Sequence, residues 1–79
     1  MPTLDALVAN LEYAKNQFGS GTAGTVRQLL RQIGRHEFRD PKLLIRFHEC
    51  LLFLRAFPQS VSLVSQVEKL LLSFHERVE

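Results

Sequence analysis

The residues best suited to chemistry in this sequence are arginines that recur at helical spacing. Arg27, Arg31 and Arg35 are four residues apart, which would place them on one face of a helix. Lys42 and Arg46 extend this run of basic residues towards the middle of the chain. Several cations on one face can contact phosphate groups, so one hypothesis is that these five residues bind nucleic acid or a phosphate anion. Charge runs of this kind are most often solvated helix faces, and we therefore keep this hypothesis as the alternative.

The net charge of +2 arises in the middle of the chain. Between residues 25 and 55, seven Lys and Arg side chains stand against three acidic ones, which gives a local charge of +4. The two flanking segments each carry a net charge of −1. The basic excess is therefore concentrated where it could form one surface.

The histidines and the single cysteine do not fall at the spacing of a metal site. His48 and Cys50 are two residues apart, so on a helix they would point about 200° apart. No histidine lies four residues from His48, and a structural zinc site takes about four ligands. We therefore predict no metal and no cofactor, and expect Cys50 to be a buried, small apolar residue. A lone cysteine forms no internal disulfide, which favours a reducing, cytoplasmic location.

One glycine-rich stretch has the letters of a nucleotide-binding motif. Gly19, Gly21 and Gly24 match the dinucleotide fingerprint, but that motif needs a strand before it, and helical spacing precedes it here. Thr25 stands where a phosphate-binding loop has its lysine. The stretch is therefore interpreted as a hinge between two helices. No acidic residue is predicted in an apolar pocket that would raise its pKa, so we predict no catalytic residues and no enzyme.

Apolar spacing predicts four helices and no strands. The first helix carries an apolar stripe from Leu4 to Phe18, with Thr3 as its cap and Gly19 as its stop. The second helix is predicted to be short, with a capping box at Thr25 and its end at Gly34.

The third helix is predicted to start with Asp40 as cap and Pro41 in the first turn, and to run to about Phe57. Ser60 or Ser62 would cap the fourth helix. The connectors are short, which favours antiparallel neighbours. We therefore expect an all-α, small four-helix bundle of three long helices and one short one, with the third helix in the middle.

Four apolar residues lie outside the predicted core stripes. On the third helix, Ile45 and Leu52 are seven residues apart and lie outside the apolar stripe that contains Phe47. Phe53 lies on the charged side of the same helix. Leu72 faces away from the stripe of the fourth helix. Neighbouring helices on both sides of a central third helix would cover Ile45 and Leu52. Otherwise, contiguous exposed apolar surface marks a contact site, and we predict that Ile45, Leu52, Phe53 and Leu72 bind a partner.

The segment from Leu51 to Pro58, which reads Leu-Leu-Phe-Leu-Arg-Ala-Phe-Pro, is followed by another amphipathic helix. This arrangement resembles the helix–turn–helix seam of helical-repeat proteins such as the tetratricopeptide class. The small residues of that class do not recur at its period of about 34 residues, so the resemblance implies no function.

The 79 residues fit a single domain, and 46% apolar content is more than such a small bundle easily hides. No apolar run reaches the roughly 18–20 residues of a membrane span. The first hypothesis is a non-catalytic helical module for protein–protein interaction or dimerisation, with another protein or a second copy as partner. Nucleic-acid binding is the alternative. A further alternative is an N-terminal accessory domain of an enzyme that continues beyond residue 79.

Overall fold

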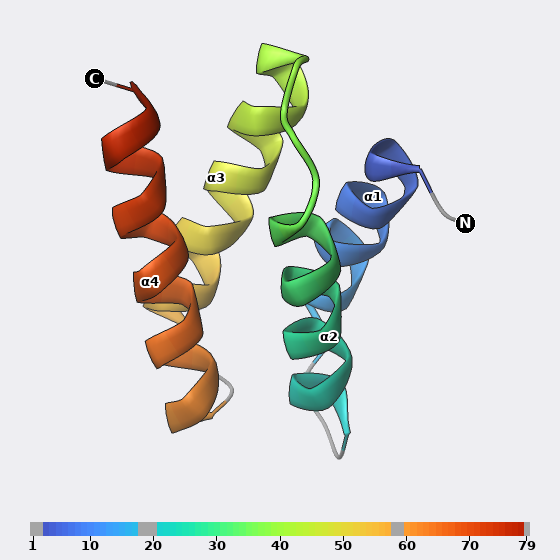
Figure 1. Cartoon of the computed structure of the whole chain (residues 1–79). Coiled ribbons are helices and arrows are strands. Elements are labelled where there is room, and N and C mark those ends of the chain that lie inside the picture. The colour runs from blue at the N-terminus through green and yellow to red at the C-terminus, as the bar shows by residue number, and fades with distance from the viewer. Residues whose placement is uncertain (1–2, 18–20, 58–59, 79) are drawn as a thin grey trace.

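The computed structural model describes residues 3–17, 21–57 and 60–78, with side chains as far as Phe74. These residues form helices α1 (Leu4–Ala14), α2 (Thr22–Gly34), α3 (Pro41–Ala56) and α4 (Val61–Val78), as Figure 1 shows. Successive helices run in opposite directions. The predicted all-α bundle with antiparallel neighbours is therefore confirmed.

The packing forms a closed ring of neighbours. Helix α1 packs against α2 and α3, and α4 packs against α3 and α2. Each helix thus has two neighbours, so α3 is not the central helix that its apolar residues suggested. One side of α3 stays open as a result, and this is where the candidate site lies.

Three predicted helix starts are confirmed by their capping hydrogen bonds. The backbone N–H of Ala6 donates to Thr3 Oγ1 at 3.2 Å, and that of Lys42 donates to Asp40 Oδ1 at 2.9 Å. Ser60 Oγ accepts from the backbone N–H of Leu63 at 3.2 Å. Each cap satisfies a backbone donor that has no partner within the helix, which fixes where the helix begins.

Helix α2 begins four residues earlier than predicted, because its N-cap is Gly21 and not Thr25. Gly21 has φ = +86°, a left-handed conformation that glycine adopts without strain. The predicted capping box at Thr25 does not form, because Thr25 already lies inside the helix and its hydroxyl donates to the Gly21 carbonyl at 3.4 Å. With 13 residues, α2 is longer than α1, which has 11 and is the short helix of the bundle.

Helix α1 ends at Ala14, before the predicted end of its apolar stripe. The N–H groups of Asn16 and Gln17 bond to carbonyls three residues back, at 3.3 Å and 3.0 Å, so the last turn tightens and the helix stops. The predicted stop at Gly19 and the apolar Phe18 lie outside the described residues.

Helix α3 ends close to its predicted end, with Phe57 as the cap residue that follows Ala56. Pro58, which was expected to limit it, is outside the described part.

The core lies between the four helices and is built from leucine, valine, isoleucine and phenylalanine side chains. Among the largest fully buried ones are Phe47, Leu11, Leu30, Ile33, Leu51 and Leu63. Burying a side chain of this size contributes about 1.5–3 kcal/mol. The described buried set contains no polar or charged residue, so the core is held by packing alone.

Aromatic rings gather at one end of this core. The Phe38 ring, from the connector between α2 and α3, stacks on Phe47 with centroids 5.4 Å apart. Phe74 of α4 lies 5.5 Å from Phe47, so three segments of the chain meet through these rings.

Among the described helices, none is both long enough and apolar enough to span a membrane.

Candidate functional site

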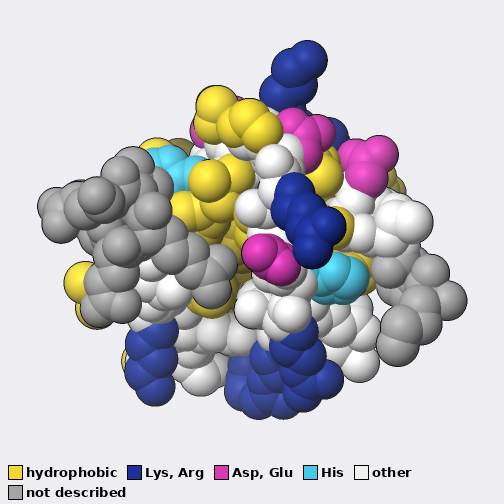
Figure 2. Space-filling view, turned by 45° about the horizontal axis from the view of Figure 1, so that its top comes forward, with side chains coloured by type: hydrophobic (Ala, Val, Ile, Leu, Met, Phe, Trp, Pro, Cys, Tyr) yellow, Lys and Arg dark blue, Asp and Glu magenta, His cyan; other side chains and the backbone are white. Residues whose placement is uncertain are grey.

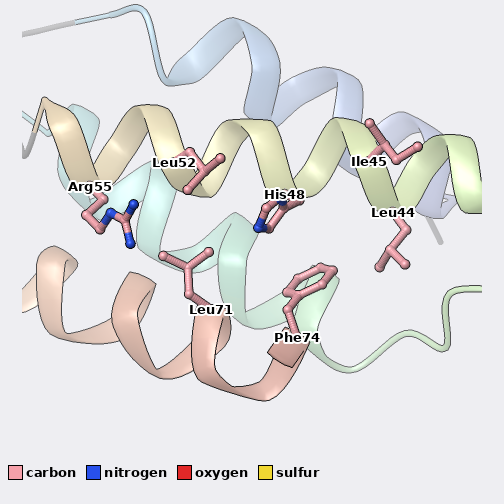
Figure 3. Close-up of a pocket in the computed structure, with 7 residues that line it drawn as sticks. All are labelled: Leu44, Ile45, His48, Leu52, Arg55, Leu71 and Phe74. Carbon is pink, nitrogen blue, oxygen red and sulfur yellow. The ribbon is translucent and has the colours of Figure 1, made fainter. Parts of the chain in front are cut away.

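An apolar groove of about 470 Å³ runs between α3 and α4 (Figure 3). Side chains from both α3 and α4 line the groove. The residues that line it are Leu44, Ile45, His48, Leu52, Arg55, Leu71 and Phe74. Figure 3 shows the first five along one helix and the last two on its neighbour, with Leu71 and Phe74 pointing towards α3.

The helical repeat of α3 explains why this groove is apolar. Its buried stripe includes Phe47, Leu51 and Leu54, which face the bundle interior. Ile45 and Leu52 are two helical turns apart on a different face, so burying the first set leaves the second set outside. The Ile45 side chain is 58% exposed and Leu52 is 37% exposed. Neighbouring helices therefore do not cover these two residues.

Two polar side chains enter the groove, and both belong to α3. The His48 ring lies 5.5 Å from the Phe74 ring, centroid to centroid, and is half-buried. Arg55 is exposed near the end of α3. No carboxylate is among the described residues that line the groove.

The predicted partner-binding residues are not brought together as one surface. Ile45 and Leu52 share the groove, but Phe53 lies on the side of α3 that faces α1. There its ring lies 5.0 Å from Phe57 and under the Lys15 ammonium, which is 4.8 Å from the ring centroid.

Leu72 is 65% exposed and does not line the groove. The exposed apolar side chains are therefore divided between the groove and other parts of the surface.

The predicted basic surface is also divided. Arg46 faces α1, where its guanidinium bonds to Glu12 Oε1 at 2.5 Å and to Asp5 Oδ1 at 3.2 Å. The hydrogen bond from Arg46 is the main reason why the pKa of Glu12 is lowered, and the same bond raises the pKa of Arg46. The Arg46 guanidinium is thus paired with two carboxylates, so it is poorly placed to bind a phosphate as well.

The remaining predicted basic residues are placed differently. Arg31, Arg35 and Lys42 are exposed, whereas Arg27 is half-buried and its backbone carbonyl accepts from Gln66 Nε2 at 3.2 Å. Figure 2 shows Lys and Arg side chains along the lower edge of the displayed face and also at its top and centre, with hydrophobic side chains at its upper left.

The metal-ligating side chains and the single cysteine are the candidates in the sequence for metal and nucleophilic chemistry. The described residues contain no cluster of three His, Cys, Asp or Glu side chains that could hold a metal ion. Cys50 is buried, as predicted, and burial raises the pKa of its thiol to about 11. A buried thiol with a raised pKa is a poor nucleophile near neutral pH, because the thiolate is the reactive form.

A second hollow lies between the end of α1 and the start of α2. Its residues include Asn10, Gln17, Thr22 and Thr25, and it is lined by more polar groups than the groove. An apolar ligand therefore has less to contact here than between α3 and α4.

Sequence reasoning missed the α4 wall of the groove. Leu71 and Phe74 belong to the apolar stripe of α4 that faces the core, where Phe74 is buried and Leu71 is half-buried. A residue at the edge of a core stripe can also form the wall of a neighbouring groove. The usable signal was that Ile45 and Leu52 lie off the core stripe of α3, which indicates a second apolar face on this helix.

No protein-family model, no curated protein and no solved structure gives a significant match to this chain. The site itself is therefore the basis for any functional argument.

Proposed function

We propose that this chain is a non-catalytic helical module that binds another protein through the groove between α3 and α4. The observation that carries the proposal is the exposure of Ile45 and Leu52 beside Leu71 and Phe74. These four side chains come from two helices and form one apolar surface.

The small size of the domain makes exposed apolar surface unfavourable unless it is used for binding. A bundle of 79 residues buries a modest share of its surface, so its margin of stability is thin. Exposed contiguous apolar surface adds nothing to that margin and promotes association, which is why it usually marks a contact site. A groove between two antiparallel helices is also a common receptor for a protein segment.

The choice of a binding module over an enzyme rests on the groups that line the groove. Its two polar side chains are His48 and Arg55, and no carboxylate is among the described residues that line it with them. Such a site can exclude water and orient a ligand, but it has no nucleophile and no paired acid and base. The cytoplasmic location expected from the single cysteine stays a prediction.

Photo-crosslinking tests the proposal directly. A photoreactive phenylalanine analogue in place of Leu52 is expected to form covalent adducts with a protein in cells that express the chain. The same analogue in place of Gln28, an exposed residue of α2, serves as the control. Mass spectrometry of the adducts distinguishes another protein from a second copy of this chain.

A matched pair of substitutions assigns the contact to the groove. Leu52→Asp is expected to abolish the adducts formed from an analogue at Ile45, whereas Leu72→Asp is expected to leave them unchanged. Equal labelling from positions 28 and 52, or equal effects of the two aspartates, would contradict the proposal. If the adducts are lost in the Leu72→Asp chain instead, the partner contacts the wider surface predicted from the sequence, which includes Leu72.

The nucleic-acid alternative has its own measurement. Binding through Arg31 and Arg35 would give an electrophoretic mobility shift that weakens steeply as salt rises. Retardation of DNA or RNA that Arg31→Glu removes and Leu52→Asp does not would favour this alternative over the groove.

A further inference from the structure

The charge of the groove restricts what can occupy it. Arg55 contributes a permanent positive charge, and none of the described lining residues carries a negative one. By contrast, Arg46 is bound to Glu12 and Asp5, and Arg39 lies 3.6 Å from Glu37. Within the described part of the chain Arg55 has no such ion pair. An occupant that covered it without supplying an acceptor would bury an unpaired charge.

The shape of the groove restricts the occupant further. From Leu44 to Arg55 the wall on α3 covers eleven residue steps, which corresponds to about 16 Å or three helical turns. The apolar side chains lie at the Leu44 end and in the middle, and Arg55 lies at the other end. A helix of about eleven residues, supplied by the bound partner, would fill this length if one of its faces were apolar.

We infer, on the basis of the proposed function, that the occupant is an amphipathic helix of another protein with a carboxylate at the end that meets Arg55. The apolar residues of the bound helix are spaced three or four positions apart, which places them on one face. This face packs on Ile45, Leu52 and Leu71. Its Asp or Glu forms an ion pair with the Arg55 guanidinium, which sets the direction of the bound helix.

A second copy of this chain, seated groove to groove, fits less well. A two-fold axis across the groove reverses its direction, so Arg55 of one copy meets the Leu44 and Ile45 end of the other. Among the described lining residues that end has no carboxylate, so within this part of the chain neither guanidinium group would find a partner. Charge complementarity therefore favours a different protein as the occupant.

A selection experiment tests this inference. The whole chain is immobilised, and a phage-displayed library of helical 16-residue peptides, with Leu, Ala, Glu and Lys allowed at each position, is selected for binding. Selected peptides are expected to carry Leu at the spacing of one helix face and Glu next to one end of it. Arg55→Glu is expected to weaken the binding of these peptides by about tenfold or more.

Charge reversal gives the internal control. Exchanging the selected Glu for Lys in the peptide is expected to restore binding to the Arg55→Glu chain, and Arg55→Lys is expected to retain most of the original affinity. Leu52→Asp is expected to abolish binding, and Leu72→Asp is not. Circular dichroism of each variant verifies that it is folded, as expected for changes at exposed positions.

Several results would overturn the inference: no peptide above background, selected peptides without an acidic position, or binding indifferent to Arg55→Glu. Self-association that Leu52→Asp abolishes, measured by light scattering, would identify a second copy as the occupant and overturn it as well. If crosslinking at position 52 captures a protein while the library yields no acidic helix, the proposed function stands and this inference fails. If the crosslinking and the peptide selection both fail, the proposed function and this inference are both wrong.

Discussion

The Arg46 guanidinium of α3 donates a hydrogen bond from Nη2 to Glu12 Oε1 of α1 at 2.5 Å. A second bond joins Arg46 Nε to Glu12 Oε2 at 3.2 Å, so the contact is bidentate. Both side chains are about one-third exposed, at 38% for Arg46 and 36% for Glu12. The pair joins two helices that are far apart in the sequence, and it withdraws Arg46 from the predicted anion-binding surface.

This pair makes the stability of the bundle depend on pH. The pKa of Glu12 is lowered from its ordinary value of 4.5 by its hydrogen bond to Arg46, so the folded state binds this proton less strongly than the unfolded state does. The stabilisation is therefore present above pH 4.5 and is lost as the pH falls through the lower pKa of the folded state. We expect Glu12→Gln to lower the urea midpoint at about pH 7, and the difference from the parent chain to narrow at about pH 3.

The control for this prediction is Glu37→Gln. The partner of Glu37, Arg39, lies in the same connector, and both side chains are more than three-quarters exposed, at 78% and 86%. Exposed pairs contribute little, so this variant is expected to follow the parent chain at both pH values. A constant difference between Glu12→Gln and the parent chain down to about pH 3 would contradict the assignment.

Two glycines at the start of α2 should respond to alanine with opposite signs. Gly21 has φ = +86°, so Gly21→Ala is strained and is expected to destabilise the protein by about 1 kcal/mol. Gly24 lies inside the helix with open space around it, so Gly24→Ala is expected to stabilise the protein by up to about 1 kcal/mol. Thermal unfolding followed by circular dichroism measures both, and shifts of the same sign would show that α2 starts elsewhere.

The Cys50 thiol should react only when the protein opens. It is 1% exposed, and burial raises its pKa to about 11. We expect a chromogenic disulfide reagent at about pH 8 to label the folded chain roughly a hundredfold or more slowly than the urea-unfolded chain. Because Cys50 is the only cysteine, the whole signal reports on this site. Fast labelling of the folded chain would mean that this part of α3 is accessible.

Two leucines that look alike in the sequence should differ strongly in their effect on stability. Leu51 is fully buried, so Leu51→Ala removes packing and leaves a cavity, at an expected loss of about 2–5 kcal/mol. Leu72 is 65% exposed, so Leu72→Ala is expected to stay within about 0.5 kcal/mol of the parent chain. Chemical denaturation measures both, and a loss at Leu72 comparable to that at Leu51 would contradict its placement on the surface.

Local chemistry explains which elements could be predicted. Thr3, Asp40 and Ser60 cap their helices through short-range hydrogen bonds that the sequence displays directly. The start of α2 was misplaced because Thr25 and Gln28 have the letters of a capping box, while a left-handed Gly21 allowed the helix to begin earlier.

Long-range contacts explain what could not be predicted. Phe38 sits in a connector with no periodicity, and its place against Phe47 follows from how α2 and α3 are joined across the bundle. Arg46 belonged to a basic run in the sequence, and it pairs with Glu12 because α1 packs beside α3.

The sequence by itself determined that the chain forms four amphipathic helices and that Ile45 and Leu52 lie off the core stripe of α3, because both follow from the 3.6-residue repeat. Only the tertiary structure decided that these two residues share a groove with Leu71 and Phe74 while Phe53 turns towards α1. The physical reason is that a helical repeat specifies the angle between side chains on one helix. The neighbour that each face meets depends on the packing of the whole bundle.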